Sequence, residues 1–378
     1  MKIGLGLYRE SLTADNFRFA RQAGATHIVA HLTNYFRGRD PSLSAGSEAE
    51  GWGDCSTDEL WDYEHFVALV KTVRDNGLEI AAIENFSPRF WSDVLLGGPD
   101  RAKQIEGLKR LVRDAGRAGI PCIGYNFSIA GVWGWSRGPF ARGEAMSVGL
   151  DLAAIDPDMP LPDGVVWNMR YRAGRPNAEP VKVSSDELWQ RLDVFLREII
   201  PVAEEAGIVM AAHPDDPPAE ALRGTVRLVN RPQKYDRLMD MLDSPSNGLE
   251  LCLGSLQEMP GTDDIYGHVR RFARRKRIGY IHFRNVRGKV PNYHETFVDD
   301  GDIDMAEIVR ILRDENYDGV MIPDHTPEMS CDAPWHAGKA FALGYMRALV
   351  QNAAALGPSR TAQARSGQKP HDKIDAPL

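Results

Sequence analysis

The sequence predicts an α/β domain of the (β/α)₈ barrel class, with an insertion after the fourth strand and a flexible C-terminal tail. Eight short apolar segments alternate with longer amphipathic segments along the 378 residues, which is the order of elements in such a barrel. The short segments are apolar at nearly every position, as is typical of parallel strands buried on both faces. An open doubly wound sheet is the structural alternative. No Gly-x-Gly-x-x-Gly follows the first strand, which argues against dinucleotide binding.

Strands are expected where apolar runs have strand length, and helices where apolar residues have helical spacing. The strands are expected at residues 3–7, 27–32, 78–84, 121–127, 208–213, 249–254, 278–285 and 319–324. The helices are expected at residues 13–23, 58–75, 101–118, 185–206, 231–242, 263–275, 304–316 and 335–354. Gly24 is placed to end the first helix, Thr57 to cap the second, and the run Ser-Ser-Asp-Glu at 184–187 to cap the fourth.

Residues 128–183 interrupt this rhythm with many Gly, Pro and Arg residues and with Trp133, Trp135 and Trp167. Loops this long in compact domains are usually functional or disordered. The tryptophans favour a lid packed over the barrel mouth, and a surface excursion or subunit contact is the alternative. Residues 357–378 are polar and aperiodic, so we expect a disordered tail after a single barrel domain over residues 1–356.

The composition limits the classes of partner. Lys and Arg number 45 against 53 Asp and Glu, and the net charge of −8 argues against nucleic acid. No run of 18 apolar residues occurs, and no signal-peptide core begins the chain, so no membrane partner is expected. The four cysteines lack Cys-x-x-Cys spacing and are interpreted as reduced cytoplasmic thiols. The basic run at 270–277 is expected at a helix end, facing away from the site. The oligomeric state is left open, a homo-oligomer included.

Four successive predicted strands carry a side chain that can bind a metal near their carboxyl ends. These are His213, Cys252, His282 and Asp324, which are 39, 30 and 42 residues apart, about one strand–helix unit each. Because active sites of such barrels lie at the carboxyl ends of the strands, we expect a divalent metal there. Each residue alone has a plainer interpretation, since a histidine or aspartate at a strand end is commonly structural and a buried cysteine is usually a small apolar residue. Cys252 is the least secure ligand by this argument.

Several segments resemble the mannonate dehydratase family. They are RQAGATHIV, ELWDYEHF, GLEIAAIE, AGIPCIGYNF, HPDDPP, LCLGS, HFRNV and PDH, and the resemblance extends from about residue 3 to residue 350. It implies a barrel related to sugar isomerases that uses Mn²⁺ or Fe²⁺ to dehydrate D-mannonate to 2-keto-3-deoxy-D-gluconate in hexuronate catabolism. The family's metal-binding pattern falls on His213, Cys252, His282 and Asp324, and its catalytic histidine falls on His325. The affinity order of divalent metals keeps Zn²⁺ open as well.

Two segments depart from the family pattern. Residues 134–138 read Gly-Trp-Ser-Arg-Gly, where the family has Asp-Trp-Thr-Arg-Thr. Residues 333–336 read Ala-Pro-Trp-His, where the family has a catalytic tyrosine before the last helix, and His336 is the candidate to take its role. Both departures bear on the substrate, and on the reaction itself, more than on the metal site.

The remaining candidates are polar residues that the barrel would bring to the same rim. His325 is expected as general acid or base, since imidazole titrates near neutral pH, and His336 shares this assignment. Arg284, two residues beyond His282, is expected to bind the substrate carboxylate through two hydrogen bonds. An ion pair within the rim is the alternative for Arg284. Candidates for substrate binding, each with a structural alternative, are Tyr8, Glu84, Asn126 and Arg137.

The sequence therefore predicts a hydro-lyase that acts on a small sugar acid. One alternative is a metal-dependent isomerase or epimerase on the same barrel, which would move a proton or hydride without loss of water. The other is a non-catalytic homologue that binds a sugar acid and does not turn it over.

Overall fold

The computed structural model describes residues 1–40, 52–353 and 355. Eight parallel strands close a barrel, in which β1 pairs with β2 on one side and with β16 on the other. The predicted fold class is confirmed, and the closure excludes the open sheet. The barrel strands are β1 (Lys2–Leu7), β2 (His27–His31), β3 (Glu79–Glu84), β4 (Cys122–Tyr125), β9 (Val209–Ala212), β12 (Asn247–Cys252), β13 (Ile278–His282) and β16 (Val320–Ile322). The expected tail at 357–378 lies outside the described residues.

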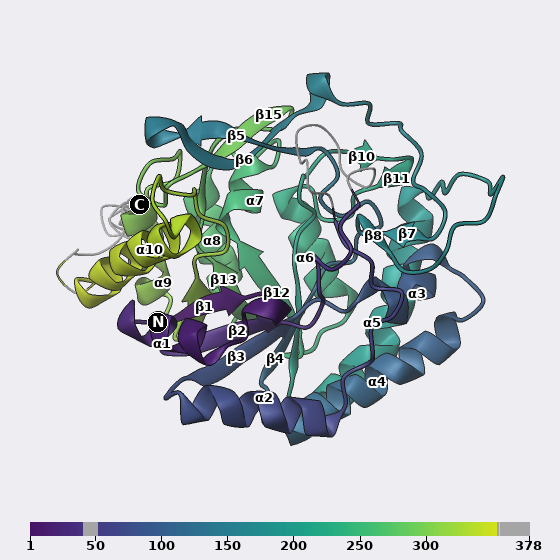
Figure 1. The fold of residues 1–378 in the computed structure, drawn as a ribbon, viewed down its shortest axis with the longest axis horizontal. Helices are drawn as coiled ribbons and strands as arrows, with labels where there is room; N and C mark the ends of the chain where they lie inside the picture. The colour runs from purple at the N-terminus through teal and green to yellow at the C-terminus, as the bar shows by residue number, and fades with distance from the viewer. Residues whose placement is uncertain (41–51, 354, 356–378) are drawn as a thin grey trace, which may run out of the picture.

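Helices cover the outside of the barrel, and Figure 1 shows α2, α4 and α5 along one side and α9 and α10 along another. Each of the eight expected helices is found, with ends shifted by a few residues. They are α1 (Ala14–Gln22), α2 (Tyr63–Asp75), α4 (Arg101–Arg117), α5 (Ser185–Ala206), α6 (Pro232–Met241), α8 (Ile265–Arg274), α9 (Met305–Asp314) and α10 (Pro334–Gln351). Two short helices follow barrel strands, α3 (Ser92–Leu96) after β3 and α7 (Leu253–Glu258) directly after β12.

The predicted helix caps are in part correct. Ser184 and Glu187 form the expected capping box at the start of α5. Thr57 does not cap α2, because that helix begins five residues later than expected and Asp62 accepts the capping hydrogen bond. The preceding segment is held in other contacts, since the buried Asp58 carboxylate binds Arg37 and the Ser87 hydroxyl. These tertiary contacts override the local capping signal.

The segment between β4 and α5 contributes to a second sheet beside the barrel. Strands β5 (Trp135–Ala141) and β6 (Ala145–Asp151) form a hairpin, and a second hairpin after β13 extends it in the order β14-β15-β6-β5. Figure 1 shows β5, β6 and β15 together at one end of the molecule. The expected strand at 278–285 was too long, because it ends at His282 and the chain re-enters as this second hairpin. The remaining strands are β14 (Asn285–Lys289), β15 (Asn292–Thr296), β7 (Val165–Val166), β8 (Met169–Arg170), β10 (Ala221–Leu222) and β11 (Thr225–Val226).

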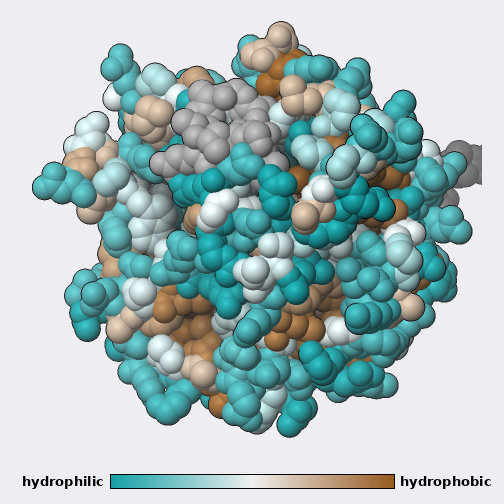
Figure 2. All heavy atoms as spheres, turned by 45° about the vertical axis from the view of Figure 1, so that its right-hand side comes forward, coloured by the Kyte–Doolittle hydropathy of each residue, from teal (hydrophilic) through white to brown (hydrophobic). Residues whose placement is uncertain are grey.

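The basic run at 270–277 is balanced by acidic neighbours. Arg270 and Arg274 pair with Glu315, and Arg275 pairs with Asp236 and Asp240. The run therefore belongs to ion pairs at the end of α8, as expected from the helix-end position. The face of the molecule in Figure 2 is mostly hydrophilic, with hydrophobic side chains gathered between hydrophilic ones. Within the described part of the chain, no helix is both long and apolar enough to cross a membrane.

Candidate metal centre and active site

The register of the barrel brings the four predicted metal ligands to one rim. Cys252 and His282 are direct partners in the ladder between β12 and β13, so their side chains leave the sheet at the same level. His213 follows the last residue of β9 directly, and Asp324 lies two residues beyond Ile322, the ladder partner of His282. Four positions far apart in sequence thus become neighbours because parallel strands end at the same edge.

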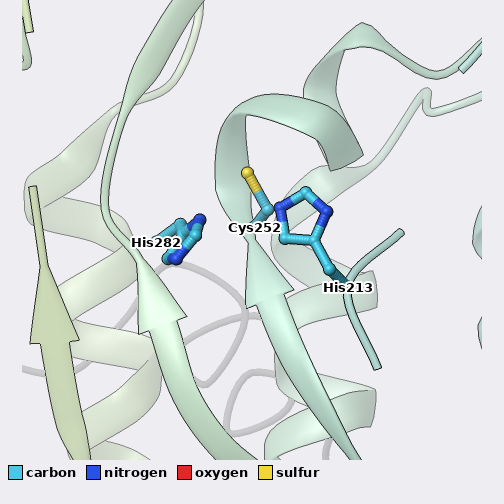
Figure 3. Close-up of side chains that lie close together, drawn as sticks. All are labelled: His213, Cys252 and His282. Carbon is cyan, nitrogen blue, oxygen red and sulfur yellow. The ribbon is translucent and has the colours of Figure 1, made fainter. Parts of the chain in front are cut away.

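His213, Cys252 and His282 form a compact cluster, in which their ligand atoms lie within 4.8 Å of one another. Figure 3 shows the three side chains gathered above the ends of β12 and β13. Asp324 joins the cluster through His282, whose Nδ1 lies 3.2 Å from Asp324 Oδ2. His213 Nδ1 lies 2.7 Å from the Pro214 carbonyl, which accepts its proton and leaves Nε2 as the nitrogen able to bind a metal.

Glu250 was missed by sequence reasoning and lies directly beneath this cluster. Its Oε1 is 2.9 Å from His282 Nε2 and 3.9 Å from His213 Nε2. Such a carboxylate behind a ligand histidine orients the ring and raises its basicity. The barrel interior has room for it because β4 carries Gly124, where a Cβ atom would lie 2.6 Å from Glu250 Oε2. The available signal was an acidic residue in an apolar strand, two positions before Cys252 and on the same face.

The donor atoms of this cluster fit a divalent cation. Both ring nitrogens of His282 and both carboxylate oxygens of Glu250 are buried without an aligned hydrogen bond among the described residues. Burial alone would raise the pKa of the Cys252 thiol, but the charge of Arg284 and the nearby His213 and His282 hold it well below its usual range. The thiolate is the form of cysteine that binds metals. A soft sulfur, imidazole nitrogens and a carboxylate together suit a transition metal.

Arg284 lies at the centre of a buried carboxylate network. Its guanidinium pairs with Glu258 at 2.7 Å, Glu295 at 3.0 Å, Asp324 at 3.2 Å and, by a shorter contact, Asp216. The side chain is 2% exposed and does not line the cavity described below. Three of these carboxylates accept hydrogen bonds from the terminal nitrogens that the expected contact with a substrate carboxylate would need. The geometry therefore favours the alternative interpretation, an ion pair within the rim that holds Asp324 and Glu295 in place.

A cavity of about 740 Å³ opens above the barrel beside the metal cluster. Asp324, which contacts His282 of the cluster of candidate metal ligands, also lies in the wall of this cavity. Much of the rest of the wall comes from strand ends, the β5–β6 hairpin, β15 and the first two turns of α10. These residues include Tyr8, His31, Trp135, Arg137, Glu295, His325, His336 and Lys339.

His325 is held in the cavity wall by a carboxylate. Its Nδ1 lies 2.7 Å from Glu295 Oε1, and the Trp135 indole packs edge-on against its ring with centroids 5.1 Å apart. Burial would lower the pKa of His325, but the charges of Asp324 and Glu295 outweigh burial and raise it. The imidazole is thus oriented through Nδ1, while its Nε2 lies 3.6 Å from Asp324 Oδ1. Glu295 could not be found from the sequence, because its position depends on the unpredicted hairpin after β13.

The structure separates the other predicted residues into two groups. Tyr8, Arg137 and His336 line the cavity, where Arg137 pairs with Glu328 at 2.7 Å and His336 Nε2 lies 3.0 Å from Asn16 Oδ1. Glu84 and Asn126 are buried and are not part of the cavity wall. Glu84 is the last residue of β3, where the Tyr280 hydroxyl donates to it at 3.1 Å.

Lys339 on α10 is a second cavity residue that sequence reasoning missed. Its side chain is buried, and this burial lowers the pKa of Lys339 to about 8. Lys339 lies on the buried face of α10 together with Ala342, Leu343 and Met346. That spacing of three, four and seven residues was the available signal, since a lysine within an apolar helix face is unusual.

Comparison with known proteins identifies the family. The model of the D-mannonate dehydratase (UxuA) family matches residues 9–150 and 174–355. The chain belongs to this family. A mannonate dehydratase of Streptococcus equi subsp. zooepidemicus is 35% identical over 287 residues, which are 72% of this chain and 76% of that protein. One of Geobacillus thermodenitrificans is 33% identical over 289 residues, 71% of this chain and 76% of that protein.

Solved structures support the same assignment at the level of the fold. The crystal structure of mannonate dehydratase from Streptococcus suis serotype 2 matches with a TM-score of 0.72 and 27% identity, over 95% of this chain and 97% of that one. A structure of L-ribulose 3-epimerase matches with a TM-score of 0.55 and 15% identity, over 98% of this chain and 99% of that one. The second likeness is one of barrel architecture alone.

Proposed function

We propose that this chain is a metal-dependent hydro-lyase that converts D-mannonate to 2-keto-3-deoxy-D-gluconate and water in hexuronate catabolism. One observation carries the proposal beyond family membership. Asp324 contacts His282 of the metal cluster at 3.2 Å and His325 at 3.6 Å, so it joins the metal ligands to a carboxylate-held histidine in one cavity. Loss of water from an aldonate needs both parts, a site that stabilises an enediolate and a group that protonates the leaving hydroxyl.

The metal ligands in this proposal are His213, Cys252, His282 and Asp324. Mn²⁺ or Fe²⁺ is the expected ion, and Zn²⁺ is kept as an alternative because nitrogen and sulfur ligands bind it strongly. When bound, the ion supplies a Lewis acid that stabilises negative charge on the substrate carboxylate after the proton on C2 is removed. Glu250 orients the His282 ring from below, and Arg284 fixes Asp324 by pairing with it at 3.2 Å.

His325 is the proposed general acid. The charges of Asp324 and Glu295 raise its pKa despite burial, so the imidazolium persists nearer to neutral pH. Glu295 accepts the hydrogen bond from Nδ1, which leaves Nε2 to deliver its proton to the departing 3-hydroxyl. Nδ1 therefore holds the ring in place while Nε2 transfers the proton.

His336 is the proposed base that removes the C2 proton, in the position where the family has tyrosine. The side-chain oxygen of Asn16 can only accept a hydrogen bond, so the 3.0 Å contact is donated by His336 Nε2. Nδ1 of the neutral ring then has a lone pair and can take a proton.

Tyr8 and Arg137 are proposed to bind substrate hydroxyls at opposite sides of the cavity. Burial is the largest cause that raises the pKa of Tyr8, so it stays a neutral hydroxyl that can donate or accept. Arg137 belongs to the segment at 128–183, for which we keep the role of a lid at the barrel mouth. Trp135, Arg137 and Ser147 of this segment line the cavity, which supports that role. Glu84 and Asn126 are proposed to support the site from below, without touching substrate.

We also propose that the enzyme works in the cytoplasm on a free small-molecule acid. The four cysteines are unpaired, and the proposed ligand Cys252 must stay reduced to bind metal.

The test is to incubate the purified protein with Mn²⁺ and a panel of aldonates and to measure 2-keto-3-deoxy acids. We expect product from D-mannonate and much less from its C2 and C3 epimers. Conversion of an aldonate to an isomer of unchanged mass would instead indicate an epimerase or isomerase. Tight binding without any product would indicate a non-catalytic homologue.

A further inference from the structure

Lys339 is a buried cation with no carboxylate of the described residues within ion-pair distance. The residue is 4% exposed, and the charges of Asp324 and Glu295 act on it only from farther away. Its Nζ donates to the backbone carbonyls of Pro323, at 2.8 Å, and of Asp324. An ammonium has three N–H donors, so one donor remains beyond these two contacts. Because a buried charge without a direct ion-pair partner is unfavourable, an anion bound in the cavity would stabilise this position.

Packing at the start of α10 explains why this lysine reaches the cavity. Gly338 lies against the loop after β16, where a Cβ atom would be 2.4 Å from the Pro327 carbonyl oxygen. A larger residue would push the helix away from the barrel. Trp335, His336 and Lys339 all line the cavity, so the amino end of α10 faces it. The helix dipole adds positive potential at that end, which favours an anion.

Two other cations near the cavity, Arg284 and Arg137, are committed to carboxylates. Arg284 is surrounded by four of them, and Arg137 pairs with Glu328 while its side chain is 42% exposed. Lys339 differs from both because its charge is buried in the cavity wall without a direct ion-pair partner among the described residues. It also lies beside Asp324, the residue shared by the metal cluster and the cavity.

We propose that Lys339 binds the carboxylate of the sugar acid and makes the cavity selective for acids over neutral sugars. This inference rests on the proposed function, since it assigns a group to the anionic end of that substrate. In this proposal Lys339 on α10 binds the substrate carboxylate, which the sequence analysis had expected of Arg284. Loss of a charged hydrogen bond in a buried site costs about 10- to 100-fold in affinity.

The test compares Lys339→Met with the wild type by calorimetry, using two ligands that differ in charge. D-mannonate is the anionic probe, and D-mannonamide, its neutral amide, keeps every hydroxyl. In metal-loaded protein that also carries His325→Asn to slow turnover, we expect Lys339→Met to weaken D-mannonate binding by about 10- to 100-fold and to change D-mannonamide binding by less than about threefold. Lys339→Arg keeps the charge and should retain part of the selectivity, and Lys339→Gln replaces the Met variant if that one unfolds.

Lys103→Met is the matched control, because this lysine is exposed on α4 and far from the cavity wall. It should leave the affinity for both ligands unchanged. Equal D-mannonate affinity in wild type and Lys339→Met, or parallel loss of both ligands, would overturn the assignment. If the wild type binds D-mannonate with this selectivity but releases no 2-keto-3-deoxy acid, the proposed reaction fails and the role of Lys339 stands. If the wild type does not bind D-mannonate, both fail.

Discussion

Two parts of the active site are built in different ways. The proposed metal rim consists of His213, Cys252, His282 and Asp324. Cys252 and His282 are paired in a barrel ladder, and His213 and Asp324 lie within two residues of the ends of β9 and β16. The mouth wall is assembled from β5, β15 and α10, which lie far apart in the sequence, and consists of Trp135, Arg137, Glu295, His336 and Lys339. A ladder tolerates little change without loss of the fold, whereas hairpins and helix starts can vary. The comparison suggests that the rim sets the chemistry and the mouth wall sets the substrate.

The largest effect is expected from removal of the rim ligands, which tests whether the rim holds the metal. His213→Ala and His282→Ala should each lower the metal content well below one ion per chain and abolish turnover, because each removes a donor from the cluster. Elemental analysis of purified protein measures the metal directly. His65→Ala on the exposed side of α2 is the matched control and should keep both metal and activity. Full metal retention in His282→Ala would refute the rim as the metal site.

Replacement of His325 separates chemistry from metal binding. His325→Asn should lower kcat by about 10²- to 10⁴-fold, the usual contribution of a general acid or base. Metal content should stay at the wild-type level, since the cluster of His213, Cys252 and His282 is untouched. Steady-state kinetics with elemental analysis of the same sample measure both. An unchanged kcat would remove His325 from the mechanism.

Glu250 tests whether the rim is supported from inside the barrel. Glu250→Gln keeps the size of the side chain but removes the charge beneath His282, so metal affinity should fall about 10- to 100-fold. Competition with a fluorescent chelator measures the affinity. Activity should recover when excess metal is added. Affinity equal to that of the wild type would mean that Glu250 does not orient His282.

The smallest effect is expected at Asp163, which belongs to the segment at 128–183 but is not among the residues that line the cavity. The Asp163 carboxylate accepts two hydrogen bonds from Arg172 and contacts Arg175, and these bonds hold its pKa below the usual range. Asp163→Asn should destabilise the protein by roughly 1 kcal/mol at pH 7, because the pairs are partly exposed.

The pH dependence of the stability difference between wild type and Asp163→Asn shows whether the effect comes from the charge of Asp163 or from packing. The folded-state pKa of Asp163 is lower than the unfolded value of about 3.9, so its stabilisation is complete above about pH 5. As the pH falls through the unfolded value, the carboxylate becomes protonated first in the unfolded state and the advantage fades. Urea unfolding at pH 7 and pH 3 should therefore show a difference between wild type and variant that shrinks at the lower pH. A constant difference would assign the effect to packing.

The rim residues could be predicted from the sequence because the signal for each of them lies within a single strand. A polar side chain after an apolar run marks a strand end, and parallel strands bring such ends together, as with His213 and Asp324. The same rule would have found His31, which ends β2 and lines the cavity. Residues 253–254 were placed in a strand but begin α7, and residues 283–285 were placed in a strand but lead into the hairpin that starts at Asn285, because an apolar run does not say where pairing stops.

The mouth wall could not be predicted in the same way. Glu295 reaches His325 only because the hairpin after β13 pairs with β6, a contact between residues about 150 positions apart in the chain. Arg284 lies near the expected place, but its partners come from α7, β15 and the loop after β9. Only the structure shows that its donors are already used. Lys339 carried a local signal, the lysine within an apolar helix face, whose meaning depends on the cavity beside it.

The central claim is that the rim and the mouth wall form one metal-dependent dehydratase site. The most direct measurement is a titration of metal-free protein with Mn²⁺ in the presence of D-mannonate, following 2-keto-3-deoxy-D-gluconate. We expect no product without metal and a rate that rises in proportion to bound metal until about one ion per chain is reached. Product formed at full rate without metal, or saturation with metal and no loss of water from D-mannonate, would contradict the claim.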